Sequence, residues 1–443
     1  MKNRIKSSLI VFSLLSLQVS AQEKKTLGLN EAIDLGIQNS KQLKGSQARI
    51  DEATAALKEA VDRRLPDAKA SASYLRFNHA DFNMKGNPTS GTGTGVVGSP
   101  QLSQAMFGLV NLSLPIYTGG KIRYGIESSK FLEQAAKLDA EDDKDEVVQN
   151  TIEAFANLFK AKTAVMLLKE NLAQSEHREK DLGNMEKNGL LARNDFLKAQ
   201  LQTSNVELSL LDAENNLQLA NVNMDLMLGL PTTTELVLDT TGIERKMDDR
   251  VLDDYLQAAL NSRKDVAAVD LRKKAAESGV KAAKGDLFPS VALTGGYIAA
   301  DIPHLASVPD ALDAGVGISY NIGSLWKNKA KVQQAQARVK QLAVTESMMD
   351  DNVRLQVNKN YLAVISQRKK IDVYLKAVEQ AQENYRIVKN KFDNSLATTG
   401  DLIDADIAQL QARLSYTLAR ADAFVAYHKL LQTSGILSAE MKK

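Results

Sequence analysis

The sequence predicts a mostly α-helical protein with some membrane β-structure, built from two tandem copies of one unit. Three observations predict this fold class. First, two long stretches, 116–230 and 310–443, contain no proline, and because an interior proline breaks a helix, both can hold very long helices. Second, short segments that alternate apolar with small or polar residues indicate strands. Third, segments of the first half recur in the second half.

The first 21 residues have the three regions of a secretory signal peptide. Lys2, Arg4 and Lys6 precede an apolar run, and small residues end at Ala21, where we expect cleavage. The mature chain is therefore predicted to be exported. Removing three positive charges from +2 leaves a formal charge of about −1, which indicates no nucleic-acid partner. Cysteine is absent, which excludes disulfides and a lipid-bearing N-terminal cysteine.

Self-comparison divides the rest of the chain into repeats over 22–235 and 236–443. Leu65–Tyr74 aligns with Phe288–Tyr297 at an offset of 223, and Asn188–Asp195 aligns with Asn394–Asp401 at an offset of 206. The difference of 17 residues lies between the strands of the first copy, in a loop rich in Gly and Pro.

Each copy is predicted to contain two strands, at about 67–82 and 104–117 and at about 290–300 and 313–323. In the second strand of each copy, apolar residues alternate with small or polar ones. Strands of about ten residues with this pattern are typical of membrane β-barrels, although half-buried strands of a soluble sheet are the alternative. Lipid does not tolerate open sheet edges, so in a membrane several chains would have to pool their strands. Loops 83–103 and 301–312 would then face outside.

Long helical hairpins are predicted at about 120–230 and 326–433. In the second, apolar residues spaced alternately by three and four form a coiled-coil seam on each helix. They are Ile371, Tyr374, Val378, Ala381, Tyr385, Val388 and Phe392, then Ile403, Ile407, Leu410, Leu414, Thr417, Ala421 and Phe424.

These repeats, with a strand hairpin behind Pro66 or Pro289 and helix tips that end at Asp195 or Asp401, resemble the TolC-like outer-membrane efflux protein family. The resemblance implies a homotrimer in which twelve strands close one barrel in the outer membrane and twelve helices continue it as a periplasmic α-barrel. It also implies the role of an outer-membrane channel, the exit duct of a tripartite efflux or type I secretion system. Its partners would be a periplasmic adaptor, an inner-membrane transporter of the efflux or ABC type, and outer-membrane lipid.

The resemblance also suggests three groups of functional residues. Asp401 and Asp404 match the family's constriction aspartates, although Ala397 stands where some members carry a latch arginine. We expect the tips to meet the adaptor through Gly189, Leu190, Leu191, Asp195, Ser395, Leu396 and Ala397, with turn packing as the alternative. Aromatic residues near strand ends are typical of the membrane interfaces of barrels, with packing in a protein core as the alternative. Those near the predicted strand ends are Tyr74, Tyr117, Tyr297, Tyr320 and Trp326.

Of the two aspartates, Asp404 is the better candidate for a carboxylate ring. Asp401 can cap the outgoing helix, and Asp195 is expected to do the same in the first copy. The counterpart of Asp404 in that copy is Lys198. An acid at this position is therefore not required to start the helix, whereas three copies around an axis would form a cation-favouring ring.

No enzyme, cofactor or metal site is predicted. Gly93–Gly98 fits a dinucleotide-binding pattern, but it follows no strand and opens no helix. The four histidines, His79, His177, His304 and His428, have no ligand-like spacing. The alternative function is an exported periplasmic coiled-coil scaffold or adaptor without a pore, which would be released in soluble form rather than with membranes.

Overall fold

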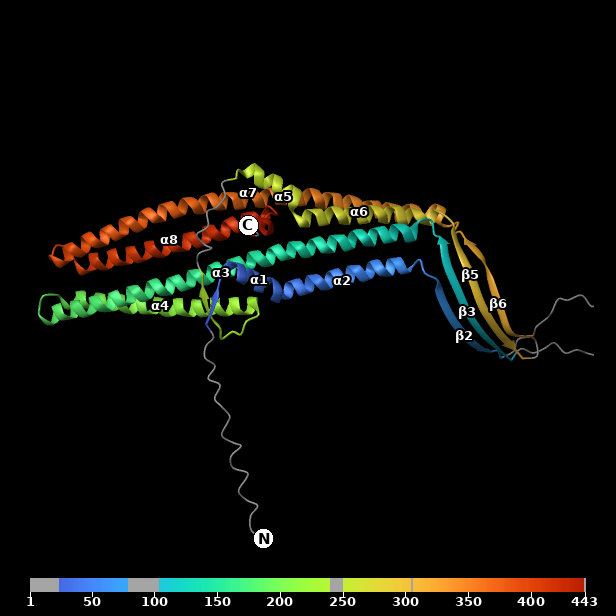
Figure 1. Cartoon of the computed structure of the whole chain (residues 1–443), viewed down its shortest axis with the longest axis horizontal. Coiled ribbons are helices and arrows are strands. Elements are labelled where there is room, and N and C mark those ends of the chain that lie inside the picture. The colour runs from blue at the N-terminus through green and yellow to red at the C-terminus, as the bar shows by residue number, and fades with distance from the viewer. Residues whose placement is uncertain (1–23, 79–102, 240–249, 304–305, 442–443) are drawn as a thin grey trace, which may run out of the picture. The chain divides into compact units, whose positions relative to one another are not determined.

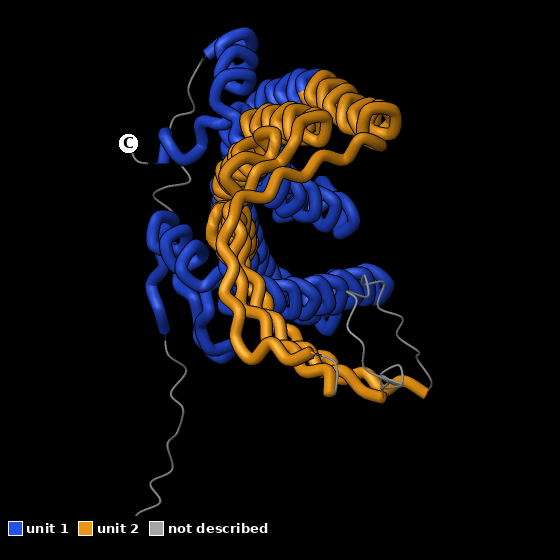
Figure 2. Tube along the Cα trace, turned by 90° about the vertical axis from the view of Figure 1, so that its right-hand side faces the viewer, with its two compact units in different colours: residues 1–45, 141–264, 350–443 blue, residues 46–140, 265–349 orange. Residues whose placement is uncertain are grey.

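The computed structural model describes residues 24–78, 103–239, 250–303 and 306–441 (Figure 1). The predicted signal peptide, nearly all of loop 83–103, the Gly93–Gly98 segment, His79 and His304 lie outside these ranges. The chain divides into two compact units (Figure 2). Unit 1 comprises Met1–Gly45, Glu141–Lys264 and Asp350–Lys443, and unit 2 comprises Ser46–Ala140 and Asp265–Met349.

Unit 2 contains a four-stranded antiparallel sheet in the order β2-β3-β5-β6. Its strands are β2 (Asp67–Arg76), β3 (Gln104–Tyr117), β5 (Ser290–Ile302) and β6 (Ala306–Ser319). The hairpin of each repeat pairs with the other through β3 and β5, so β2 and β6 are the edge strands. The unit also holds α6 (Lys264–Lys284) from Asp265 onward, the short 3-10 helix η2 (Gly285–Leu287) and parts of three helices that continue into unit 1.

The second hairpin corrects the prediction of a loop at 301–312. β5 continues to Ile302 and β6 begins at Ala306, so most of that range is strand. Pro309 lies within β6, where the β5–β6 register shifts between Ile298 and Ala300. Proline is tolerated at such an irregularity on an edge strand, because no ladder hydrogen bond is lost there.

The strand ends also differ from the predicted ones. β6 stops at Ser319 instead of 323, because the chain turns where the Ser324 hydroxyl and amide both donate to the Asn321 carbonyl, at 2.6 and 3.0 Å. β2 ends at Arg76, short of the predicted 82.

Unit 1 is built from helices and one small parallel sheet. The sheet pairs β1 (Lys24–Leu27) with β4 (Glu235–Leu238). The helices of the chain are α1 (Leu29–Asn39), α2 (Lys41–Asp62), α3 (Lys121–Lys187), α4 (Arg193–Leu228), α5 (Leu252–Ser262), α7 (Ser324–Asp393), α8 (Thr399–Thr433) and α9 (Leu437–Glu440). Of these, α2, α3 and α7 run through both units. The unit's core includes Ile152 and Phe155 on α3 and Met224 on α4, all fully buried.

The element bounds repeat at the two offsets found in the sequence. With 223 added, α1 gives the bounds of α5, and β2 begins where β5 begins. With 206 added, the end of α3 gives the end of α7, and the start of α4 gives the start of α8. The two copies are therefore the same supersecondary unit.

The predicted seam of the second hairpin lies along the packed side of α7. Every seam residue from Ile371 to Phe392 is half-buried, whereas most residues between them are exposed. On α8 the seam holds except at Ile407, which is exposed. Figure 1 shows α7 and α8, and likewise α3 and α4, as antiparallel pairs. No helix in the described ranges is long and apolar enough to cross a membrane.

Candidate functional site

The sheet of unit 2 carries most of its large apolar side chains on one face. The register aligns Val110 with Tyr297 and Leu312, and it aligns Leu114 with Leu293 and Val316. These side chains are exposed or half-exposed, and Leu312 reaches 86%. The chain's own helices therefore do not bury this face.

The opposite face is mostly small or polar. It carries Ser71 and Ser73 on β2, Asn111 and Ser113 on β3, Thr294 and Gly296 on β5, and Asp313, Gly315 and Gly317 on β6. The large apolar exceptions among the paired residues are Leu75, Phe107, Leu109, Ile298, Ile302 and Val308. The sheet thus has one apolar face and one face suited to water.

Four of the five predicted girdle aromatics belong to the apolar face. Tyr74 aligns with Met106 at the end of the sheet far from the helices. Tyr117 follows a register shift that brings it opposite Val291, at the end nearest the helices, and Tyr320 follows the last residue of β6. Tyr297 lies between them. The fifth, Trp326, lies in the first turn of α7 instead of at a strand end.

The two helix tips have the same turn geometry. After α3 the Leu190 amide donates to the Met185 carbonyl at 2.8 Å, and after α7 the Leu396 amide donates to the Lys391 carbonyl at 2.7 Å. This bond closes a Schellman motif, which needs a left-handed residue just before it. Gly189 takes that place with φ 71°, and Ser395 takes it with φ 59° despite its Cβ.

Of the three predicted tip leucines, only two are exposed. Leu190 and Leu396 are 72% and 76% exposed. Leu191 is half-buried and packs against the cluster of Leu182, Ala199 and Ile403. Contrary to the expectation that Leu191 is part of the exposed tip, it packs between the helices.

The structure also corrects the assignment of the helix caps. The N-cap of α8 is Thr398, not Asp401, and Asp401 is the acid of a capping box. Its Oδ2 accepts hydrogen bonds from the Thr398 amide and hydroxyl, both at 2.8 Å, and these bonds lower the pKa of Asp401. In the first copy the N-cap position is Ala192, which has no capping side chain, and Asp195 pairs with Lys198 at 3.1 Å.

Asp404 lies one turn beyond the capping box. It is exposed and makes no hydrogen bond or ion pair within the described part of the chain. The two predicted constriction aspartates therefore differ, since one carboxylate holds the helix start and the other is free.

Sequence reasoning missed a buried charge two residues further on. Asp406 is 1% exposed, and its Oδ2 accepts hydrogen bonds from Arg178 Nη2 at 2.7 Å and Asn171 Nδ2 at 3.2 Å. The neighbouring residues Leu402, Ile403 and Ala405 are also buried. An acid inside this apolar run was the available signal, because a buried carboxylate requires a partner.

Arg178 and Asp406 form an ion pair between α3 and α8, and two further ion pairs join the same helices. The others join Lys160 to Asp422 and Glu170 to Arg413, both at 2.9 Å. The pairing is antiparallel and fixes the register between a helix of the first repeat and a helix of the second.

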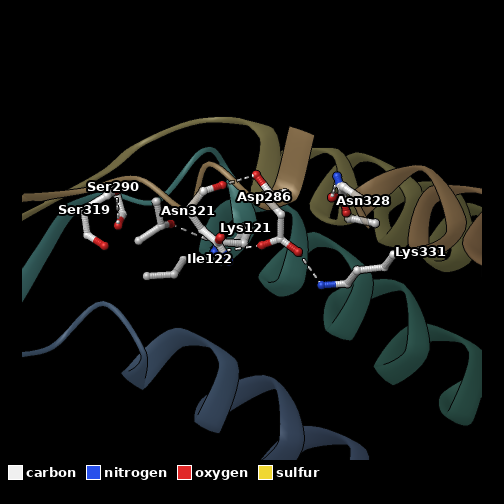
Figure 3. Close-up of polar contacts among 11 residues, drawn as sticks. Lys121, Ile122, Asp286, Ser290, Ser319, Asn321, Asn328 and Lys331 are labelled. Atoms are coloured by element: carbon white, nitrogen blue, oxygen red, sulfur yellow. Dashed lines mark hydrogen bonds and ion pairs between the residues drawn. The ribbon is translucent and has the colours of Figure 1, made fainter. Parts of the chain in front are cut away.

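The strand-to-helix junction of unit 2 is held by close backbone contact and one shared carboxylate. A Cβ on Gly119 would lie 2.2 Å from the Gly285 carbonyl oxygen, so these turns require glycine. Figure 3 shows Asp286 between Lys121 and Lys331, to which it is ion-paired. Hydrogen bonds from both lysines lower the pKa of Asp286.

The remaining histidines of the described chain stand apart. His177 lies 3.4 Å from Asp181 on the surface of α3, and the buried His428 Nδ1 lies 2.9 Å from the Phe424 carbonyl. Within the ranges given above, no three His, Asp or Glu side chains are grouped as metal ligands.

Comparison with known proteins gives consistent matches across the chain. A family described as "Outer membrane efflux protein" matches residues 32–230 and 255–435. Outer membrane efflux protein BepC of Brucella suis biovar 1 is 21% identical over 379 residues, covering 84% of this chain and 80% of BepC. The structure of VceC from Vibrio cholerae superposes with a TM-score of 0.74 at 18% identity, covering 92% of this chain and 96% of VceC. That of the CmeC channel of Campylobacter jejuni gives 0.75 at 18% identity, covering 94% and 88%.

Proposed function

The chain belongs to the outer membrane efflux protein family, and on that premise we propose that it is the exit duct of a tripartite efflux pump or type I secretion system. Members of this family are outer-membrane channels of tripartite pumps, and the helical part of this protein lies in the periplasm. Substrates delivered by an inner-membrane transporter, through a periplasmic adaptor, would leave passively through the duct. The observation that carries the proposal is the sheet with an exposed apolar face and a small, polar opposite face.

The length of the apolar face fits a bilayer. Met106 and Tyr117 are 11 residues apart on β3, about 36 Å at roughly 3.3 Å per residue. Tilted by about 45°, such a strand covers about 26 Å of membrane depth, close to the apolar band of barrels. Tyr74 and Tyr117 would then mark the two interfaces.

Two features support assembly into a homotrimer. Among the described residues, the edge strands β2 and β6 have no neighbour on one side. Lipid does not tolerate open edges, so three chains would close a twelve-stranded barrel. In addition, α4 and α7 carry exposed apolar stripes with identical steps of 7, 3 and 8 residues. The stripes are Leu201, Leu208, Leu211 and Leu219, and Leu355, Leu362, Ile365 and Val373. Packing α4 of one chain on α7 of the next would close a twelve-helix α-barrel.

We assign adaptor docking to the two tips. Leu190 and Leu396 project from identical turns, and an exposed leucine at a helix tip is suited to an apolar contact with a partner. Gly189, Asp195, Ser395 and Ala397 would shape the same surface, with Leu191 packed beneath it. Leu190→Glu with Leu396→Glu should abolish export while the trimer remains as abundant as in the wild type. Loss of the trimer would instead indicate a packing role.

Conductance tests the proposed function. In fractionated cells the protein should be found with the outer membranes. After purification it should form ion-conducting pores in planar bilayers. An exported coiled-coil scaffold without a pore would be released in soluble form and give no conductance. The matched variant Leu112→Asp with Leu293→Asp, on the apolar face, should abolish insertion, whereas Ser113→Asp on the polar face should still conduct. Equal conductance of both variants would contradict the assignment of the faces.

A further inference from the structure

A basic pocket lies at the strand-to-helix junction of unit 2. It has a volume of about 780 Å³ and is bounded by the end of β3, the first turn of α3 and the end of α6. Four cations line it, namely Arg64, Arg123, Lys281 and Lys284, and none of its described lining residues carries a carboxylate. Its apolar wall includes Ile116 and Tyr117.

The four cations are exposed, and none makes an ion pair within the residues that the structure describes. The nearby Asp286 does not neutralise them, because Lys121 and Lys331 occupy its carboxylate (Figure 3). Tyr124 brings two of the cations together. Its ring centroid lies 5.8 Å from Arg123 Cζ and 5.6 Å from Lys281 Nζ. Cations that border one ring and have no acidic partner favour an anionic ligand.

The internal repeat shows that the fold does not require all of this charge. In the other copy, the counterparts of Arg64 and Lys284 are the apolar Leu287 and Val61, and that of Tyr124 is Ala330, whereas Arg123 and Lys281 correspond to Lys329 and Lys58. Two of the four cations, and the tyrosine that contacts the other two, are therefore specific to this junction and call for another explanation.

The position of the pocket along the membrane normal indicates the chemistry of the ligand. Tyr117 ends the apolar face on the side of the periplasmic helices, and phospholipid headgroups lie immediately beyond the hydrocarbon band. Arginine pairs with phosphate through two parallel hydrogen bonds, and basic pockets at membrane interfaces bind anionic headgroups.

We propose that Arg64, Arg123, Lys281 and Lys284 bind the phosphate of an anionic phospholipid in the periplasmic leaflet. The site rests on the proposed membrane placement of the strand face. It anchors the junction between strands and helices to the leaflet, with the acyl chains lying along the apolar face beside Tyr117.

Native mass spectrometry of the full-length protein in detergent, titrated with phosphatidylglycerol or phosphatidylethanolamine, tests the site. The wild type should bind phosphatidylglycerol the more tightly. Replacing all four cations by glutamine should weaken that binding at least about tenfold, since each cation near an anionic surface contributes about 1 kcal/mol. The charge-matched control replaces four exposed lysines of unit 2 outside the pocket, Lys58, Lys130, Lys329 and Lys340, and should bind as the wild type does.

Three results would overturn the proposal. They are equal loss of binding in both quadruple variants, competition by inorganic phosphate as effective as that by the lipid, and dissociation of the oligomer in the pocket variant alone. The last would mean that carboxylates of a second copy occupy the pocket. Bilayer conductance is measured in parallel and separates this proposal from the proposed function. If the protein forms normal pores but binds phosphatidylglycerol and phosphatidylethanolamine equally, only the lipid site is refuted.

Discussion

At the scale of single residues, the two tip aspartates have different tasks. Asp401 holds the start of α8 through Thr398, whereas Asp404 is exposed and free of partners in the described structure. The first copy has Lys198 at the position of Asp404, where it pairs with Asp195. The equivalent helix of the first copy therefore starts without an acid at this position, and Asp404 is not needed for the helix start.

We predict that Asp404→Asn lowers the cation preference of the pore. Three copies around the axis would place like charges close together, and such a ring attracts cations at a constriction. The measurement is the reversal potential in planar bilayers under a salt gradient. Asp401→Asn is the control, and it should weaken the helix start more than it changes selectivity. An unchanged reversal potential in a properly assembled Asp404→Asn variant would refute the ring.

A second residue-scale prediction concerns Asp225, which is fully buried at the end of α4. Its Oδ2 accepts a hydrogen bond from Asn221 at 2.9 Å, and burial raises its pKa to about 6. The folded state therefore binds more protons than the unfolded state between about pH 4 and pH 6, and stability falls as pH rises through that window.

Asp225→Asn should remove this component of the pH dependence. At pH 8 the variant should be more stable by up to about 3 kcal/mol, and the advantage should shrink towards pH 4. Thermal unfolding of both proteins in detergent across this range measures it. If the stabilities of the wild type and Asp225→Asn changed with pH in the same way, the raised pKa of Asp225 would be contradicted.

The sequence could predict residues whose role follows from position, and it missed those whose role follows from packing. The exposure of Leu190 and Leu396 could be predicted because the tip of a helical hairpin is exposed whatever the direction of the helices. Asp406 was missed because only the partner helix shows that its side of α8 is covered, and Thr398 was missed as the cap because the helix starts two residues before Asp401.

At the scale of elements, the contact between α3 and α8 joins the two repeats within one chain. Its innermost pair, Arg178 and Asp406, is buried, whereas the pair of Glu170 and Arg413 is substantially exposed. A buried charge deprived of its partner is strongly destabilising, and an exposed pair contributes little.

We therefore predict that Asp406→Asn destabilises the protein by on the order of 3 kcal/mol. The apolar double variant Arg178→Met with Asp406→Leu should recover most of the loss, because neither charge then remains buried. Glu170→Gln, the matched change at the exposed pair, should cost less than about 1 kcal/mol. Thermal unfolding measures all three, and equal costs for Asp406→Asn and Glu170→Gln would contradict this account.

The long helices were predictable from the sequence to within a few residues, because proline is absent and the seam spacing is regular. The length of β5 and β6 was not, because a strand that contains a proline is not expected from the sequence. Only the register shift opposite Ala299 reveals that an edge strand accommodates Pro309.

At the scale of the whole molecule, the repeat was the most informative signal, since both offsets recur in the element bounds. Within the described part of one chain, the edges β2 and β6 and the stripes on α4 and α7 are uncovered. Each of these surfaces is apolar or has unpaired backbone groups, and we propose that each is covered by another copy of the same chain.

The central claim is that three chains together form one duct. Native mass spectrometry of the protein extracted in detergent measures this most directly. The account predicts a dominant species with the mass of three mature chains, which Leu208→Lys on the α4 stripe should reduce to smaller species. A spectrum that contains monomers only, from protein that is otherwise folded, would contradict it.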